Sequence, residues 1–160
     1  MDFLRVLLVP VAGALTFAPA FADDVRLPER KAGLWELITT MDEGLGPKDQ
    51  SMKLCIDADM ERTTVAASME EHNKQCSKHD VTRQGDRTVV EMSCQFASRH
   101  VASHTEMSGD FQNAFEVKIE STTSGEQNQQ NVSVKRTILQ KGKYLGESCG
   151  DLVGGEAMGA

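Results

Sequence analysis

The sequence predicts a mainly β (α+β) protein: an antiparallel meander of about seven strands, curled into an open, barrel-like sheet, with one helix in its N-terminal third. Three observations predict this fold. Short segments with apolar residues at every second position recur along the chain, turn-forming residues separate them, and a single stretch has helical composition. Strands that alternate in this way form a sheet with one covered and one wet face, and a sheet of this size twists and tends to curl.

The first 22 residues have the features of a secretory signal peptide. Arg5 gives a weakly positive start, residues 6–17 are almost entirely apolar, and the Ala-Phe-Ala of 20–22 places small residues where signal peptidase reads them. The apolar run is far shorter than the roughly 20 residues that span a membrane. We therefore expect cleavage after Ala22, a periplasmic location and no stable membrane insertion.

The rest of the chain is expected to form one domain with short flexible ends. Residues 23–31 are charged and contain a proline, which predicts a flexible lead-in. Residues 32–150 are the predicted disulfide-bonded, β-rich domain, and residues 151–160 are expected to be a disordered tail. The predicted strands are 34–41, 51–57, 75–82, 87–96, 99–109, 111–120 and 131–139, with a short closing strand near 144–149.

Alternation places the strands, and turn residues end them. In 51–57, the apolar Met52, Leu54 and Ile56 alternate with polar residues, which predicts a half-buried strand. Strands 75–82 and 87–96 flank the turn sequence RQGD and are typical of a hairpin. In the later strands, the side chains expected to point inward are Phe111, Phe115, Val117, Ile119, Val132, Val134 and Ile138.

The one predicted helix covers residues 58–73. This stretch is rich in Ala, Met and Glu and lacks glycine and proline. Met60, Val65 and Met69 share one helical face, although polar residues dilute it. An aspartate at the start, Asp57 or Asp59, is a suitable N-cap.

Four cysteines in an exported chain indicate disulfides. Cys76 and Cys94 lie on the two arms of the predicted hairpin, equally far from its turn, where a cross-strand bond is geometrically easy. That pairing leaves Cys55 with Cys149. Sequence alone permits three pairings, and an intermolecular bond through Cys149 is the alternative. The absence of a C-x-x-C pair argues against a redox catalyst or a zinc ribbon.

Charge and composition exclude several functions. The formal net charge is −7 and no run of basic residues occurs, which argues against a nucleic-acid partner. No G-x-S-x-G motif is present, and the carboxylates are scattered. We therefore expect no catalytic residue and no cofactor, and we predict that the protein is not an enzyme.

Histidines and methionines supply the remaining candidates. His104 and Glu106 share one face of a predicted strand, but His100 on that face is about 13 Å from His104 at strand spacing, too far to share a metal ion. His72 and His79 have no predicted partner. We expect no metal site. Trp35 is expected to be a core residue, and it is also a candidate ligand contact together with Met52, Met92 and Met107.

The order of the motifs resembles a known family. Gly33-Leu34-Trp35-Glu36 near the mature start is followed by Met52 to Cys55, then by the cysteine-flanked hairpin, and finally by Gly146 and Cys149. This order is similar to that of the small exported bacterial proteins catalogued as domain of unknown function 3617. The resemblance implies export and a β-rich, disulfide-bonded domain. It implies no activity.

The leading hypothesis is a periplasmic, non-enzymatic binding module of unknown specificity for an apolar or lipid-like ligand. A curved sheet with flexible methionine side chains would provide the binding surface. The alternative is a cell-envelope protein-interaction module with no small-molecule ligand, which would use a sheet face or an exposed edge.

Overall fold

The computed structural model describes residues 26–127 and 130–159. The predicted signal peptide, residues 1–22, lies outside them. The elements are β1 (Gly33–Asp42), β2 (Lys48–Ile56), α1 (Ala58–Gln75), β3 (Cys76–Gln84), β4 (Arg87–Phe96), β5 (Arg99–Gly109), β6 (Ala114–Gln127), β7 (Gln130–Gly146) and β8 (Ala157–Gly159).

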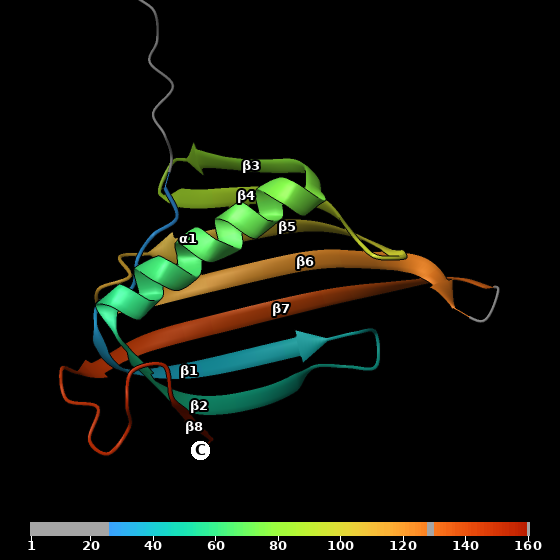
Figure 1. The fold of residues 1–160 in the computed structure, drawn as a ribbon. Coiled ribbons are helices and arrows are strands. Elements are labelled where there is room, and N and C mark those ends of the chain that lie inside the picture. The colour runs from blue at the N-terminus through green and yellow to red at the C-terminus, as the bar shows by residue number, and fades with distance from the viewer. Residues whose placement is uncertain (1–25, 128–129, 160) are drawn as a thin grey trace, which may run out of the picture.

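All eight strands form one antiparallel sheet in the order β3-β4-β5-β6-β7-β1-β2-β8. Strands β3 to β7 are a meander, and the hairpin of β1 and β2 lies between β7 and β8. The sheet is strongly curved and α1 crosses its concave side (Figure 1). Within the described residues, β3 and β8 are edges that do not pair with each other, so the sheet is open. The predicted mainly β class and open, barrel-like sheet are confirmed, with β8 as an additional strand.

The core lies at one end of the concave side. Its buried members are Trp35, Leu37, Ile56, Phe111 and Phe115. Trp35 is 0% exposed, and its ring lies 5.4 Å from that of Phe115, centroid to centroid. The expectation that Trp35 is a core residue is therefore confirmed.

Helix α1 begins as the sequence indicated and packs loosely. The side chain of Asp57 accepts hydrogen bonds from the N–H groups of Asp59 and Met60, which is a standard N-cap. Of the 18 residues of α1, all described, none is buried. The contacts of the helix are concentrated on β3 and β4, so it covers only part of the sheet. No helix among the described residues has the length and apolar character needed to cross a membrane.

Both ends of the domain are more ordered than the sequence indicated. In the lead-in, the N–H of Lys31 donates to the carbonyl of Phe111, and Arg30 forms an ion pair with Glu61 of α1. In the tail, β8 pairs with β2, and the N–H of Gly155 donates to the carbonyl of Cys55. Backbone pairing with an edge strand orders this segment, which alternation does not mark because β8 has only three residues.

Candidate functional site

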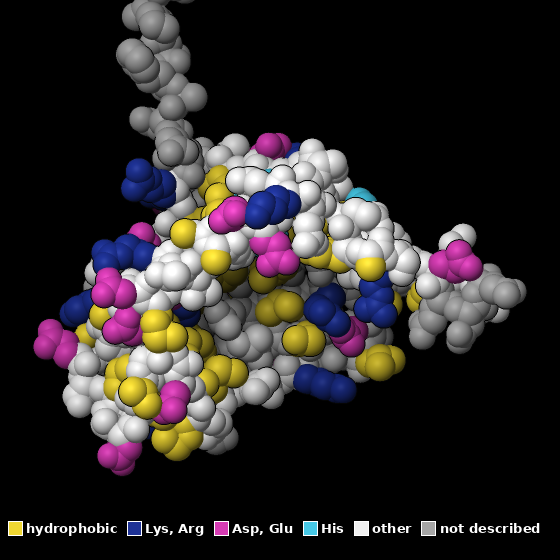
Figure 2. Space-filling model, in the orientation of Figure 1, with side chains coloured by type: hydrophobic (Ala, Val, Ile, Leu, Met, Phe, Trp, Pro, Cys, Tyr) yellow, Lys and Arg dark blue, Asp and Glu magenta, His cyan; other side chains and the backbone are white. Residues whose placement is uncertain are grey.

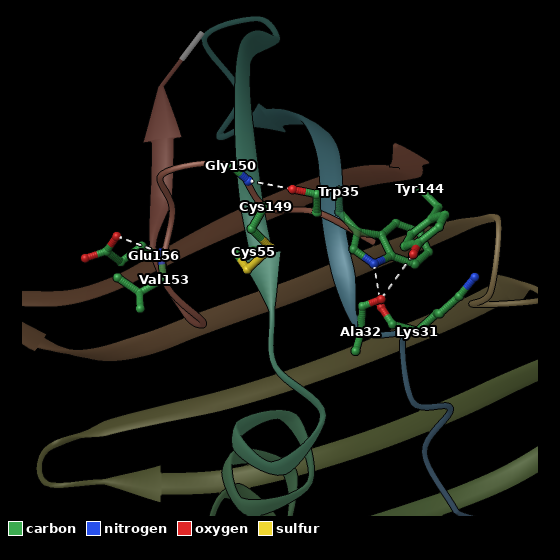
Figure 3. The surroundings of a disulfide bond; sticks show 10 residues. Lys31, Ala32, Trp35, Cys55, Tyr144, Cys149, Gly150, Val153 and Glu156 are labelled. Atoms are coloured by element: carbon green, nitrogen blue, oxygen red, sulfur yellow. Dashed lines mark hydrogen bonds between the residues drawn. A yellow bond between two sulfur atoms is a disulfide. The ribbon is translucent and has the colours of Figure 1, made fainter. Parts of the chain in front are cut away.

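An aromatic cluster closes one end of the concave side. The indole Nε1–H of Trp35 donates to the carbonyl of Lys31 at 2.8 Å, and the Tyr144 hydroxyl donates to the carbonyl of Ala32 at 3.3 Å (Figure 3). The rings of Phe111 and Phe115 are stacked with centroids 5.1 Å apart. With its polar atoms satisfied and its rings in contact, this end is packed protein.

Two disulfides lie next to the two ends of α1: one joins β2 to the segment after β7, and the other joins β3 to β4. Cys55 bonds to Cys149 and Cys76 bonds to Cys94, which confirms the preferred pairing. Cys55 lies two residues before the N-cap Asp57. Cys76 is itself the C-cap of the helix. A helix that buries none of its described residues is thus flanked by two cross-linked strand ends, in addition to its contacts with β3 and β4.

The space between α1 and the uncovered part of the concave sheet is named here the concave trough. Figure 2 shows a hollow below the helix with hydrophobic side chains inside it. Register and alternation put a row of mostly apolar side chains across this side, one from each of five neighbouring strands. The row consists of Met41, Ile138, Ile119, Thr105 and Val90. Met41 is 38% exposed, and Ile138 and Ile119 are half-buried, so part of the row remains open to solvent.

The acidic side chains of the described strands are confined to one face of the sheet, whereas basic side chains lie on both faces. The same register gives the concave face four cationic strand residues, Lys48, Arg83, Arg99 and Arg136. Within the described strands, every carboxylate lies on the opposite, convex face: Glu36, Asp42, Asp49, Asp80, Glu91, Glu106, Glu116, Glu120 and Glu126. The protein is acidic overall, yet the strand residues that face the helix carry only positive charge.

Two of these cations line one pocket at the end of the trough away from Trp35. Arg99 and Arg136 lie with Thr123, Val132 and Val134 around a volume of about 450 Å³, whose lining also includes the carboxylates of Glu43 and Glu126. Arg136 donates to Glu43 in the loop after β1, through its Nε at 2.6 Å and through a second nitrogen. Arg99 forms no ion pair with any residue in the described part of the chain.

A second pocket lies on the other side of Glu43. Its volume is about 440 Å³, and Met41, Leu45 and Lys48 are among its lining residues. Leu45 is 89% exposed. The two pockets give this end of the trough an apolar surface next to charged side chains of both signs.

Ser103 lies in the floor of the trough, between Met92 of β4 and Ser121 of β6 in the register. The residue is 9% exposed. Its Oγ is buried and has no hydrogen-bond partner among the described residues. A buried hydroxyl in that state has unused capacity to donate and accept.

A histidine-carboxylate cluster occupies the convex face. The ring of His104 is within hydrogen-bond distance of Glu91 and of Glu106, the latter at 3.2 Å. The hydrogen bond to Glu91, followed by that to Glu106, raises the pKa of His104, and the bond to His104 lowers the pKa of each glutamate. The residues described contain no group of three or more His, Cys, Asp or Glu arranged to hold a metal ion.

The prediction that His72 and His79 lack partners is wrong. Their rings lie 5.3 Å apart, which brings the last turn of α1 against β3. Burial, and secondarily the neighbouring His72, lowers the pKa of His79. The pair therefore acts as a contact between helix and sheet.

The predicted ligand residues fall into two groups. Trp35, Met52 and Met107 belong to or pack against the buried cluster at the closed end, whereas Met92 is half-buried on the concave face. The sequence reasoning missed Arg99 and Arg136. For Arg136 the sequence did contain an indication, because this residue alternates in step with Val134 and Ile138, whose side chains were predicted to point inward.

The fold and the trough define a class: an open antiparallel sheet whose concave side is crossed by a helix flanked by two disulfides. A family model matches residues 30–149 with the description "Protein of unknown function (DUF3617)". The chain belongs to this family. A search of curated proteins gives no significant match, and neither does a search of solved structures.

Proposed function

We propose that the protein is an exported, periplasmic, non-enzymatic binding module that holds an apolar or lipid-like ligand in the concave trough. The observation that supports this most directly is the loose helix. An ordinary domain buries the inward face of such a helix, whereas α1 buries none of its described residues and leaves a hollow beneath it (Figure 2).

The covalent attachment of α1 supports the same function. A helix that must leave room beneath it cannot be stabilised by close packing against the sheet. Disulfides at Cys55 and Cys76 cross-link the strand ends that precede and follow the helix without filling the space beneath it. Disulfides also fit an oxidising compartment such as the periplasm.

Native mass spectrometry of the mature chain, purified from the periplasm without reductant, tests this proposal. We expect a non-covalent adduct that can be extracted into organic solvent. The Ser121→Phe variant, which places a ring on the concave face of β6, should lose the adduct. The Thr122→Phe variant, which places the same ring on the convex face, should retain it. Bare wild-type protein, or equal retention by both variants, would contradict ligand binding in the trough.

A protein-interaction module is the second candidate, because the sheet has unpaired edges. The outer side of β3 is an edge, and β8 pairs only with Met52, Lys53 and Leu54, so Lys48–Ser51 of β2 is also open to an added strand. Cross-linking in cells from a photoreactive residue at Gln50 or Thr82 would capture such a partner. Equal cross-linking from a site away from both edges would contradict edge docking.

A further inference from the structure

We propose that the ligand in the concave trough is an anionic amphiphile, with its carboxylate or phosphate head group at Arg99 and Arg136 and its hydrocarbon chain on the apolar row toward the closed end. This inference rests on the proposed binding function and specifies the chemistry of the ligand. It follows from how charge, apolar surface and glycine are placed on the concave face.

The first support is the sign of the charge. The described strands present Lys48, Arg83, Arg99 and Arg136 to the concave side and direct all of their carboxylates to the convex side. In a chain with a net charge of −7, this segregation is opposite to the overall bias. A cationic amphiphile would face repulsion from these side chains, and a neutral one would leave Arg99 without an ionic partner.

The helix does not cancel this positive charge. Glu61 is the one half-buried acidic residue of α1 in the described structure, and it pairs with Arg30. The guanidinium of Arg30 lies over the ring of Phe115 at the closed end, 6.0 Å from the ring centroid. The arginine at the closed end is therefore paired, whereas Arg99 at the other end has no ion-pair partner among the described residues, and this difference sets the orientation of an anionic amphiphile.

The two arginines differ in their readiness to bind an anion. Arg136 already has a carboxylate partner in Glu43, at an exposed ion pair of the kind that contributes little to stability and exchanges readily. Arg99 has no such partner among the described residues. An anionic head group in this pocket would accept hydrogen bonds from Arg99 and would share the guanidinium of Arg136 with Glu43. Arginine offers carboxylate and phosphate groups a bidentate geometry for such contacts.

A glycine positions Arg99. Gly125 of β6 lies opposite Arg99 in the register. A Cβ at this position would come within 2.9 Å of the Ser98 carbonyl oxygen and 3.3 Å of the Arg99 Cγ. The missing side chain lets Arg99 lie across β6 into the pocket that it shares with Arg136.

Ser103 supplies a second polar group along the same path. Its row in the sheet contains Arg136, Ser121 and Ser103 in successive strands. The Oγ of Ser103 is buried and has no partner among the described residues, so rotation of this side chain toward the trough would let it bond an ester or hydroxyl oxygen next to the head group. The arrangement of two arginines, a hydroxyl and an apolar row matches an acyl chain with an oxygen-rich, negatively charged end.

The test is isothermal titration of the delipidated, oxidised mature chain with single-chain lipids below their critical micelle concentrations. Lysophosphatidylglycerol and lysophosphatidylcholine with the same acyl chain differ in net head-group charge, and a fatty acid of equal length replaces phosphate by carboxylate. We expect the anionic probes to bind at least tenfold more tightly than lysophosphatidylcholine, on the order expected for a charge-assisted hydrogen bond. The stronger of the two anionic probes identifies the head-group type.

Two charge-reversal variants locate the effect. Arg99→Glu should raise the Kd for the anionic probes by roughly tenfold or more and leave lysophosphatidylcholine unchanged. Lys135→Glu makes the same change in net charge on the convex face beside the same pocket and should change neither Kd by more than about twofold. Circular dichroism of both variants confirms that the comparison is between folded proteins.

The outcomes separate the two proposals. Equal affinity for charged and zwitterionic probes, or an Arg99→Glu variant that behaves like Lys135→Glu, would overturn the anionic specificity and leave a binding module for apolar ligands. Failure of every probe to bind the wild-type chain would overturn the binding function as well.

Discussion

Gly142 marks the tightest contact in the core. An added Cβ at this position of β7 would lie 2.1 Å from a ring carbon of Phe115, which is itself buried against Trp35. Because the ring cannot move without disturbing the aromatic cluster, we expect Gly142→Ala to lower the free energy of unfolding by about 1–3 kcal/mol. Urea denaturation followed by Trp35 fluorescence measures this change.

Gly146 in the same strand is the matched control. A Cβ there meets no atom within 4 Å. Gly146→Ala should therefore change the free energy of unfolding by no more than about 0.5 kcal/mol. An equal loss in the two variants would mean that glycine flexibility in β7, and not the close approach of Phe115, is responsible.

The His104 cluster predicts a pH-dependent contribution to stability. Since the pKa of His104 is raised above its ordinary value of 6.5, its stabilisation is fully present below pH 6.5 and is lost as the pH rises through the raised pKa. Since the pKa values of Glu91 and Glu106 are lowered from 4.5, their stabilisation is present above pH 4.5 and is lost as the pH falls through the lowered values. The advantage of wild type over His104→Gln should be largest between these limits.

Thermal unfolding of wild type and His104→Gln across this pH range measures that advantage. The Glu91→Gln, Glu106→Gln background provides the control, because without the carboxylates the same His104 substitution should have an effect that no longer varies in this way. A constant difference in Tm between wild type and His104→Gln at all pH values would show that these exposed groups do not contribute through their charges.

At the scale of the secondary-structure elements, α1 depends on its covalent ends. Replacing Cys76 and Cys94 by serine removes the bond at the C-cap, while the N-cap and the other disulfide remain. We expect faster amide hydrogen exchange across residues 58–75, greatest toward the C-terminal end, with little change in β6 and β7. Because no described residue of α1 is buried, packing offers little resistance to this opening. Unchanged exchange in α1 would show that its contacts with β3 and β4 suffice.

The strands in which apolar residues recur at every second position could be predicted from the sequence. The predicted strand at 99–109 coincides with β5, and the inward parity of Met52, Leu54 and Ile56 places them beside the core cluster. Asp57 as N-cap and a weakly amphipathic helix were also visible, because both depend on local residue types.

Other features depend on distant parts of the chain and have no local pattern. Strand β8 exists because Cys149 brings the tail to the edge of β2. The shared pocket of Arg99 and Arg136 requires the register of three strands. The contact of His104 with Glu91 likewise requires the pairing of β4 with β5. The alternation of residues along a strand indicates the face of the sheet on which a side chain lies. Only the order and register of the strands indicate which side chains lie beside it.

At the scale of the whole molecule, the Cys55–Cys149 bond closes the larger of the two loops, with a sequence separation of 94 residues. The chain-entropy relation gives such a bond a stabilisation of about 4–5 kcal/mol, against about 3 kcal/mol for the 18-residue separation of Cys76 and Cys94. We expect the Cys55→Ser, Cys149→Ser variant to lose more stability than the Cys76→Ser, Cys94→Ser variant in guanidinium denaturation. The reverse order would indicate that the shorter bond stabilises the native helix directly.

The place of the first hairpin in the sheet has a consequence for folding. Strands β1 and β2 are the first to be synthesised, yet they lie between β7 and β8, so that Leu34 pairs with Gly146 and Met52 pairs with Gly159. The meander from β3 to β7 can form from local pairings, whereas the hairpin must wait for the end of the chain before both its sides are hydrogen-bonded. Trp35 lies on that hairpin, so we expect the aromatic core to close only after β7 has been made, and the outer side of β2 to be paired only after β8.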